Sequence, residues 1–511
     1  MRTTTYLALV TTGILITVYL YKKLSEYLTI TDLERKNGCM QPRKYPHKDP
    51  LLGLDLFFKL GAAMKTGKVL QANRELYATY GKTFQSNSWG TPTIHTCESE
   101  NIKTVLALSF GGWIAGGSGD LYRRWEDMVT LACARSTYTE ISNFAALEKH
   151  VARFLNLLPR DDSTVDLQPL TKNLFLDIST GFMFGESVES QSPNAPFDAR
   201  EFLNAFDMTM RGLGARMMLG KLKFIRGRDI EWKKAFGKVH AYIDKHVSRV
   251  LESQKSVENK GEEDKSTAQK HYIPLNEMAK ETQDLMDLRH QLFHVFIPAH
   301  DATGIAVSDI FFHLARDAHR WDKLQRDVLA ATTGQTMSFE ILKSMKYLRY
   351  VFNENLRLHP TAGYLRRVCH RDTILPLGGG PDGKAPFLVR KGSNITCDIH
   401  ALHRDKSYWG NDVDDFRPER WETLRPTWEY LPFSGGPRIY PAQQMVFTDS
   451  AYIIVKVMQK FSKMESRDSR PWMERFRMAV ENGNCVRIKL VQDELDVQRS
   501  FEGISHTIEL Y

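Results

Sequence analysis

An acid and a base lie three positions apart in a stretch with helical spacing, and a third charged residue comes later in an aromatic motif. Glu354 and Arg357 would share one helical face, where a carboxylate and a guanidinium can pair. Arg420 lies in the irregular segment FRPERW, residues 416–421. The first pair is weak evidence alone, because any exposed helix offers such pairs, so its meaning depends on the other motifs of the chain.

The second candidate site is a glycine-containing loop, Phe433–Pro441, that precedes a helix expected from about Pro441 to Phe461. Proline in the first turn favours the start of that helix. The loop carries Arg438, a fixed positive charge, and Tyr440, an ionisable phenol. The loop therefore places a charged and an ionisable side chain directly before the predicted helix.

The apolar spacing predicts the elements that carry these residues. Helices dominate residues 51–251, and a long helical stretch over Leu285–Leu329 is interrupted once, at Pro298. Another helix, Leu342–Leu358, stops before Pro360, as the restricted residue before a proline requires. Short strands are expected at Thr373–Leu377, Phe387–Thr396 and Cys485–Val491. The chain is therefore mainly α, with a small β portion.

The glycine-rich segment GGGPDG, Gly378–Gly383, matches a dinucleotide-binding pattern and comes after a strand. Pro386 and a β-branched run come next instead of a helix, so no helix N-terminus is available for a pyrophosphate. The segment therefore predicts a tight turn.

Composition limits the class of protein. The 511 residues include 69 Lys plus Arg and 61 Asp plus Glu, a net charge of +8 that is dilute over this length. Charge therefore gives no argument for nucleic-acid binding. With 42% hydrophobic residues the chain can bury a large core. Its six cysteines include no Cys-x-x-Cys pair, which argues against a disulfide framework or zinc ribbon and suits a reducing compartment.

An uncharged N-terminal segment, Thr3–Tyr21, precedes Lys22 and Lys23. We expect residues 1–23 to form a retained transmembrane anchor, because no small-residue cleavage site ends the apolar run as in a signal peptide. The excess of Lys and Arg after the segment places the rest of the protein in the cytosol.

Composition also defines three further parts of the chain. Residues 24–50 form a proline-rich hinge, and residues 51–511 form a single domain. Residues 252–270 are polar and of mixed charge, which predicts a solvated loop within that domain.

Taken in order and spacing, these motifs resemble the cytochrome P-450 (haem-thiolate monooxygenase) superfamily over essentially the whole chain. The resemblance is greatest to the fungal microsomal type that hydroxylates alkanes and fatty acids, including the segments YPHKDPLLGLDLF and GGGPDG. It implies a helical prism with a small β portion, a haem, a lipophilic substrate, an NADPH-dependent reductase as partner once haem is bound, and no nucleic acid. It also implies a single-pass protein of the endoplasmic reticulum membrane whose soluble domain is cytosolic.

The resemblance assigns roles by motif position. A buried ion network on the haem side would consist of Glu354, Arg357 and Arg420. Positions that bind haem propionates are matched by Arg438, Arg367 and Trp125, and arginine suits them because a guanidinium pairs bidentately with a carboxylate.

The family's defining cysteine, two positions after the loop arginine, is here Tyr440. A thiolate donates electron density to iron and favours O–O cleavage, whereas a Tyr ligand belongs to catalase, a different chemistry. A phenol also ionises less readily than a thiol, with an ordinary pKa near 10 against about 8.5. Tyr440 would therefore be an axial ligand of a changed kind, an acid, or neither.

Two other departures lie on the oxygen and haem side. In the long helix the family's proton-relaying acid remains as Asp301, but the alcohol after it is Ala302. Val129 replaces a propionate arginine. His300 lies about 200° around the helix axis from Ala302, which predicts a packing or surface role for its imidazole.

These departures leave three interpretations. The first is a haem-poor or haem-free member that performs non-oxidative chemistry on a terpenoid, polyketide or fatty-acid-like molecule of fungal specialised metabolism, with Asp301 and Tyr440 as candidate acids. The second is an active haem-dependent monooxygenase with an atypical proximal side. The third is a non-catalytic binder or a decaying duplicate.

Overall fold

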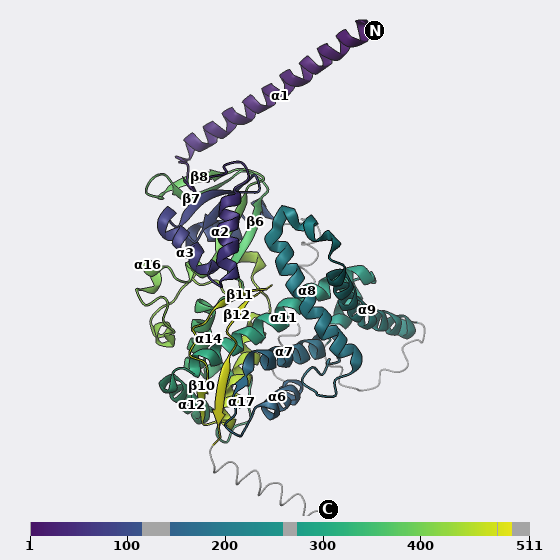
Figure 1. Ribbon diagram of the computed structural model, residues 1–511, viewed down its shortest axis with the longest axis vertical. Coiled ribbons are helices and arrows are strands. Elements are labelled where there is room, and N and C mark those ends of the chain that lie inside the picture. The colour runs from purple at the N-terminus through teal and green to yellow at the C-terminus, as the bar shows by residue number, and fades with distance from the viewer. Residues whose placement is uncertain (1, 115–143, 259–272, 478, 493–511) are drawn as a thin grey trace, which may run out of the picture. The chain divides into compact units, whose positions relative to one another are not determined.

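Helices make up most of the described chain, in agreement with the apolar spacing. The computed structural model describes residues 2–114, 144–258, 273–477 and 479–492 (Figure 1). The chain divides into two compact units. The first consists of Met1–Lys59, Asn73–Gly117 and Leu365–Asp398, and the second of Leu60–Ala72, Ser118–Tyr364 and Ile399–Tyr511.

A six-stranded sheet characterises the first unit, with the strand order β1-β2-β3-β9-β6-β4. Its strands are β1 (Arg43–Lys44), β2 (Thr83–Ser88), β3 (Thr91–Thr96), β9 (Asn394–Asp398), β6 (Tyr364–Cys369) and β4 (Trp113–Ile114). The helices around it in the sequence are α1 (Arg2–Lys36), α2 (Leu54–Lys65), α3 (Val69–Tyr80) and α4 (Ser99–Lys103). β2 and β3 pair in antiparallel fashion, and β3 pairs with β9 in parallel.

The glycine-rich junction is a turn between β7 (Thr373–Gly379) and β8 (Ala385–Val389), which pair in antiparallel fashion. Gly378, Gly380 and Gly383 have positive φ angles, which side chains disfavour, and the amide of Gly378 donates to the carbonyl of Gly383 over 2.7 Å. A strand and not a helix comes next, so the prediction of a tight turn is confirmed.

The second unit is mostly helical. Its longer helices are α6 (Ala145–Leu157), α7 (Leu167–Phe184), α8 (Phe197–Leu219), α9 (Ile230–Glu258), α11 (Leu285–Leu314), α12 (Ala318–Thr332), α14 (Lys346–Leu358) and α17 (Gln443–Lys460). Its shorter helices are α10 (Pro274–Glu281), α13 (Phe339–Ser344), α15 (Ile399–Leu402) and α16 (Lys406–Trp409). Its strands are β5 (Val165–Asp166), β10 (Lys463–Ser466), β11 (Glu474–Phe476), β12 (Val480–Asn482) and β13 (Arg487–Val491).

Two clusters of buried apolar side chains meet along α11. The cluster around its C-terminal half includes Ile310 and Phe311 and draws on α6, α7, α12, α14 and α17. The cluster around its N-terminal half includes Leu292 and Phe296 and draws on α8, α9 and α10. Polar side chains in the second half of α11, such as Asp301 and Asp309, are therefore buried and held in fixed surroundings.

Two predicted helix boundaries are wrong. Pro298 does not interrupt α11, because the packed turns on both sides of the proline hold the helix together where the proline alone would weaken it. The stretch breaks instead after Leu314, and α12 begins where the Asp317 carboxylate accepts a hydrogen bond of 3.0 Å from the amide of Arg320.

The helix expected over Leu342–Leu358 is two helices, α13 and α14, because Met345 has a non-helical ψ of 84°. Its end at Leu358 is confirmed, as is the helix before Phe461. The predicted loop 252–270 is helical up to Glu258, since its Glu, Gln and Lys residues are good helix formers. The rest of that loop lies outside the described residues.

α1 extends over the predicted anchor and into the predicted hinge. Residues 24–36 are helical because the prolines of the hinge begin only at Pro42. No helix in the part of the chain that the structure describes is long and apolar enough to cross a membrane. The anchor over residues 1–23 stays a prediction.

Candidate active site

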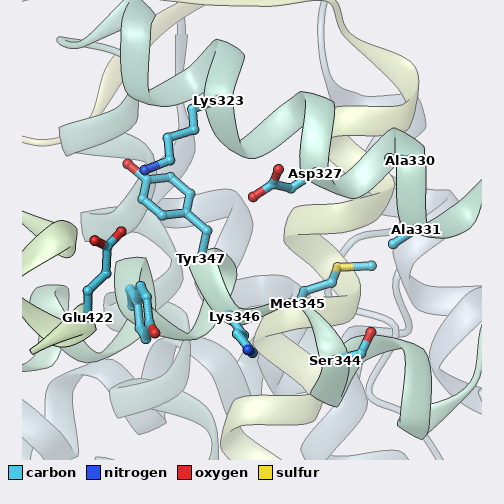
Figure 2. Close-up of a pocket in the computed structure, with 10 residues that line it drawn as sticks. Lys323, Asp327, Ala330, Ala331, Ser344, Met345, Lys346, Tyr347 and Glu422 are labelled. Atoms are coloured by element: carbon cyan, nitrogen blue, oxygen red, sulfur yellow. The ribbon is translucent and has the colours of Figure 1, made fainter. Parts of the chain in front are cut away.

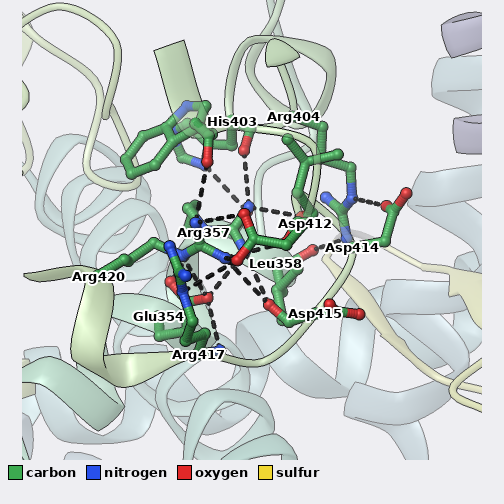
Figure 3. A network of polar contacts seen from close by, with 12 residues as sticks. Glu354, Arg357, Leu358, His403, Arg404, Asp412, Asp414, Asp415, Arg417 and Arg420 are labelled. Atoms are coloured by element: carbon green, nitrogen blue, oxygen red, sulfur yellow. Dashed lines mark hydrogen bonds and ion pairs between the residues drawn. The ribbon is translucent and has the colours of Figure 1, made fainter. Parts of the chain in front are cut away.

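The structure brings Glu354, Arg357 and Arg420 together in one fully buried cluster, which we call the ion network (Figure 3). Arg357 donates to both carboxylate oxygens of Glu354 over 2.9 and 2.8 Å, and Arg420 donates to the same carboxylate over 2.9 Å. The indole of Trp421 adds a fourth hydrogen bond of 3.0 Å to Glu354. Every carboxylate oxygen is thus satisfied, as a buried charge requires.

Backbone carbonyls and the carboxylate of Asp412, which lies 3.3 Å from Arg420, accept the remaining guanidinium protons of the ion network. Arg357 donates to the carbonyls of His403 and Val413 over 3.0 and 2.8 Å. Arg420 donates to the carbonyls of Trp409 and Asp412 over 3.0 Å each. One carboxylate on α14 therefore holds the irregular chain between α15 and the 416–421 segment in place.

The loop with Arg438 and Tyr440 lies directly before α17. The amide of Tyr440 donates to the carbonyl of Phe433 over 2.9 Å, and the two rings are nearly parallel, with centroids 6.3 Å apart. Gly436 has a φ of 70°, and a Cβ at Gly435 would lie 2.9 Å from the ring of Trp428. The glycines therefore allow the tight bend that brings Tyr440, which is half-buried, to the start of the helix.

Asp301 lies on α11, is 6% exposed, and has a charged neighbour on another helix. The ammonium of Lys172 on α7 is 3.6 Å from its carboxylate. Lys172 also contacts Glu481 on β12 directly. The candidate acid is therefore in a buried charge cluster and not in an apolar surrounding.

The imidazole of His300 packs among aromatic rings. It stacks on Phe296 with a centroid distance of 5.3 Å and meets Phe206 edge-on at 4.7 Å. The predicted packing role is confirmed.

Arg367 and Trp125 are the two other predicted propionate residues. Arg367 is half-buried on β6, and its guanidinium donates to the carbonyl of Arg366 over 2.9 Å. It belongs to the first unit, whereas Arg438 belongs to the second. Trp125 and Val129 lie outside the described residues.

A buried polar string that no sequence motif predicts lies in the second unit. The carboxylate of Asp309 on α11 accepts a hydrogen bond of 3.1 Å from the indole of Trp472. The ring of His359 stacks on Trp472, and its Nε2 lies 2.8 Å from Nε2 of His313. In the sequence, Asp309 could have been recognised as a buried acid, because it lies between apolar residues of α11 that form the core.

Burial perturbs the ionisation of this string. It raises the pKa of Asp309 to about 8, despite the indole hydrogen bond. Burial, assisted by nearby arginines such as Arg316, lowers the pKa of His313 to about 3, and burial with His313 lowers the pKa of His359 well below its ordinary value. At neutral pH the string is therefore uncharged.

A surface pocket of about 670 Å³ opens between α12, the junction of α13 and α14, and Glu422 (Figure 2). On its wall the hydroxyl of Tyr347 donates to Glu419 over 2.7 Å, and the ammonium of Lys323 lies 3.9 Å from the centre of the same ring. None of the predicted site residues lines it, so it is not the candidate active site.

Comparison with known proteins gives the same family as the sequence motifs. The sequence model of the family described as cytochrome P-450 matches residues 121–484, more than half of the chain. The chain belongs to the cytochrome P-450 family. It is 35% identical to the cytochrome P-450 monooxygenase iccC of Talaromyces variabilis over 477 residues, which cover 89% of this chain and 93% of the relative.

Two further relatives are also fungal. The cytochrome P-450 monooxygenase apdE of Emericella nidulans is 34% identical over 480 residues, which cover 90% of each chain. The cytochrome P-450 monooxygenase fsdH of Fusarium heterosporum is 32% identical over 500 residues, which cover 94% of this chain and 88% of the relative. Family membership implies haem as cofactor, and the relatives are named as oxidative enzymes.

The residues present fit a haem in part. Arg438 is a half-buried guanidinium of the kind that pairs with propionates. Tyr440 offers a phenol oxygen, a donor that haem iron accepts in catalase, and the loop contains no thiol. In the described part of the chain, no cluster of three or more His, Cys, Asp or Glu residues could hold a metal ion by itself.

Proposed function

We propose that the protein acts on a lipophilic small molecule of fungal specialised metabolism and that conventional oxygen insertion is lost or impaired. The observation that carries this proposal is Tyr440 at the position where the family has its thiolate ligand. A haem supplies oxygen activation in this family, and the thiolate is the ligand that favours O–O cleavage. A phenol at that position removes this contribution.

Non-oxidative chemistry by Asp301 and Tyr440 is the form of the proposal that we favour. Asp301 is buried and its carboxylate lies 3.6 Å from the ammonium of Lys172, so an acidic side chain is held at a fixed place inside the fold. Tyr440 is half-buried beside Phe433 and carries an ionisable phenol. An acid and a phenol suffice for proton transfer to and from an unsaturated or carbonyl-containing substrate.

A second candidate is a haem-dependent monooxygenase with an atypical proximal side and a reductase partner. It is supported by the satisfied ion network around Glu354, by the retention of Arg438 and Arg367, and by the relatives, which are named as monooxygenases. In this case Arg438 and Arg367 would hold the haem propionates.

The absorbance spectrum of the purified full-length protein separates the two candidates. A folded sample without a Soret band is expected for the favoured proposal and would rule out the monooxygenase. A strong Soret band with near-stoichiometric haem would rule out a haem-poor protein. Tyr440→Phe is the matched control, because it keeps the ring and removes only the oxygen donor: a Soret band lost in this variant identifies Tyr440 as an iron ligand.

Tyr440→Cys restores the family's thiol. We expect it to restore haem binding poorly, because Val129 still replaces a propionate arginine and two acids, Glu126 and Asp127, stand beside it. Haem content per polypeptide is the measurement, and full occupancy in this variant would contradict the expectation.

We also propose that the protein associates with the endoplasmic reticulum membrane through α1. This proposal is supported by the apolar side chains that α1 exposes, among them Leu15 and Leu20. The test compares the full chain with a variant that lacks residues 1–23 in flotation with lipid vesicles. Equal flotation of the two proteins would exclude residues 1–23 of α1 as the contact.

A further inference from the structure

We propose that residues 493–511 of this chain bind in the surface pocket between α12, α13 and α14. These residues lie outside the described part of the chain, so the argument uses only their amino-acid sequence. Its other grounds are the lining of the pocket, the charge around it and the place where the segment is attached. The inference goes beyond the proposed function, because it involves neither the candidate acids nor haem.

The pocket presents apolar surface next to groups that bind carboxylates (Figure 2). Ala330 and Ala331 on α12, together with Met345 at the junction of α13 and α14, form its apolar part. Two ammonium groups reach it from different helices, that of Lys323 from α12 and that of Lys346 from the first residue of α14. Such a lining suits a peptide segment that carries both apolar and acidic side chains.

The charge around the pocket is positive. Asp327 and Glu422 also line it and balance the two lysines, but residues 318–350, which form α12, α13 and the start of α14, contain six Lys or Arg and three Asp or Glu. Lys323 lies 3.8 Å from Glu419, whereas Lys346 is exposed and forms no ion pair with any of the described residues. Lys346 is therefore the cation that can pair with a bound acidic segment.

The segment 493–511 has the opposite charge and its own apolar residues. Its sequence, DELDVQRSFEGISHTIELY, contains five Asp or Glu and one Arg, a net charge of −4. Opposite charges favour the encounter of two surfaces, and apolar side chains supply area that can be buried once they meet. The apolar and aromatic members of the segment are Leu495, Val497, Phe501, Ile504, Ile508, Leu510 and Tyr511.

The segment is attached close to α12, the helix that forms one side of the pocket. The carbonyl of Val491, at the end of β13, accepts a hydrogen bond of 2.9 Å from the amide of Ser462. The carbonyl of Ser462 in turn accepts one of 2.9 Å from the indole of Trp321 on α12. An extended chain of this length spans up to about 60 Å, whereas a helix with its side chains is about 10–12 Å wide. The segment can therefore pass around α12 and reach the pocket.

Attachment to the same chain favours this segment over an external ligand of similar charge. A segment tethered near its binding site has an effective concentration on the order of millimolar. A contact with a dissociation constant of about 0.1 mM would therefore be occupied roughly nine-tenths of the time. The bound segment would cover Lys346 and exclude other acidic ligands from the pocket.

The first test is cleavage of the full-length protein by trypsin at Arg499, the one Lys or Arg in residues 493–511. The measurement is the rate at which the peptide 500–511 is released, followed by mass spectrometry. We expect this rate to be about tenfold lower than for a free peptide of residues 493–511, because protease cleaves only the unbound fraction.

Two variants of the pocket should change this rate in opposite directions. Lys346→Glu should raise the rate by about threefold, because it replaces the attracting charge by a repelling one. Asp327→Asn should lower the rate by about twofold, because it removes a repelling charge from the pocket. Lys233→Glu, which reverses an exposed charge on α9, is the matched control and keeps the wild-type rate.

The second test identifies the two partners. A carbodiimide couples a carboxylate directly to an ammonium group with which it pairs, so treatment of the full-length protein should join Lys346 to an acid of residues 493–511. A mixture of unlabelled and nitrogen-15-labelled protein distinguishes coupling within one chain from coupling between two copies.

Cleavage of the wild type as fast as the free peptide, or an unchanged rate in Lys346→Glu, would overturn the inference. Coupling of Lys346 only between copies would also overturn it, because the occupant of the pocket would then be a second molecule. If Lys346→Glu does not fold, the slower cleavage of Asp327→Asn and the coupling of Lys346 in the wild type decide the question, and the absence of either has the same consequence.

Discussion

Two buried polar regions of the second unit differ in how completely their groups are satisfied. In the ion network, hydrogen bonds reach both oxygens of Glu354, and carbonyls accept the outer guanidinium protons of Arg357 and Arg420. In the string from Asp309 to His313, one oxygen of Asp309 and Nδ1 of His359 are buried without a hydrogen bond. The first region consists of paired ions. The second is uncharged at neutral pH, because Asp309 keeps its proton and the two histidines are not protonated.

The two regions differ in charge because their carboxylates have different hydrogen-bond donors. Two guanidinium groups supply enough donors for one carboxylate, and the chain around them supplies carbonyls. Among the described residues, Asp309 has an indole as its one hydrogen-bond partner, and an indole carries one donor and no charge. We therefore expect the ion network to determine stability and the string to determine how stability depends on pH.

The largest loss of stability is expected from Glu354→Gln. It removes the anion that Arg357 and Arg420 share. Arg420 keeps the Asp412 carboxylate 3.3 Å away, whereas Arg357 is left with carbonyl acceptors, and breaking a buried ion pair in this way costs about 3–5 kcal/mol. The measurement is the midpoint of urea unfolding followed by circular dichroism. Glu422→Gln, an exposed acid in the same segment, is the matched control and should change stability by less than about 0.5 kcal/mol. Equal midpoints for the two variants would show that the ion network does not stabilise the fold.

Asp309→Asn should increase the stability of the fold, whereas Glu354→Gln decreases it. A folded-state pKa of about 8 against an ordinary 3.8 means that the folded chain binds the extra proton, so this group's contribution is complete below pH 3.8 and is lost as pH rises towards 8. Asparagine keeps an acceptor for Trp472 and removes the titration. We expect a gain of about 1–3 kcal/mol at pH 7 and a smaller gain at pH 5. A gain in stability that does not grow with pH would contradict the raised pKa of Asp309.

His313→Phe should make the protein less sensitive to acid. With a pKa lowered to about 3, His313 is neutral in the folded chain, so its contribution is present above pH 6.5 and is lost as pH falls towards 3. The loss of stability between pH 6 and pH 5 should therefore be smaller in the variant by about 1 kcal/mol. At pH 7 the variant should be less stable than the wild type, because Nε2 of His359 loses its partner. Unfolding midpoints at the three pH values test both parts, and an unchanged slope would refute the first.

The sequence predicts these two regions to very different degrees. Glu354, Arg357 and Arg420 belong to motifs whose order and spacing identify the family, and a helical spacing of three already allows the first pair. Asp309, Trp472 and His359 come from three separate segments that only tertiary packing brings together, so no local pattern connects them. The same holds for the contact of Lys172 with Asp301.

The helix errors have a similar cause. Local rules predict a break at Pro298 and none at Met345, yet α11 is continuous and the break occurs between α13 and α14. Packing of the buried face of α11 outweighs the local cost of one proline. The helix end at Leu358 and the turn at Gly378–Gly383 are correctly predicted, because a nearby proline and positive φ angles act within a few residues.

The smallest effect on stability is expected for an arginine–glutamate pair that is exposed to solvent. Arg249 and Glu186 contact each other with side chains that are 51% and 58% exposed. A double-mutant cycle with Arg249→Gln and Glu186→Gln should give a coupling free energy of about 0.2–1 kcal/mol that falls with added salt. The corresponding cycle on Arg357 and Glu354 should give several-fold more and respond little to salt, since both side chains are fully buried. Equal couplings in the two cycles would mean that burial does not strengthen the pairing of Arg357 with Glu354.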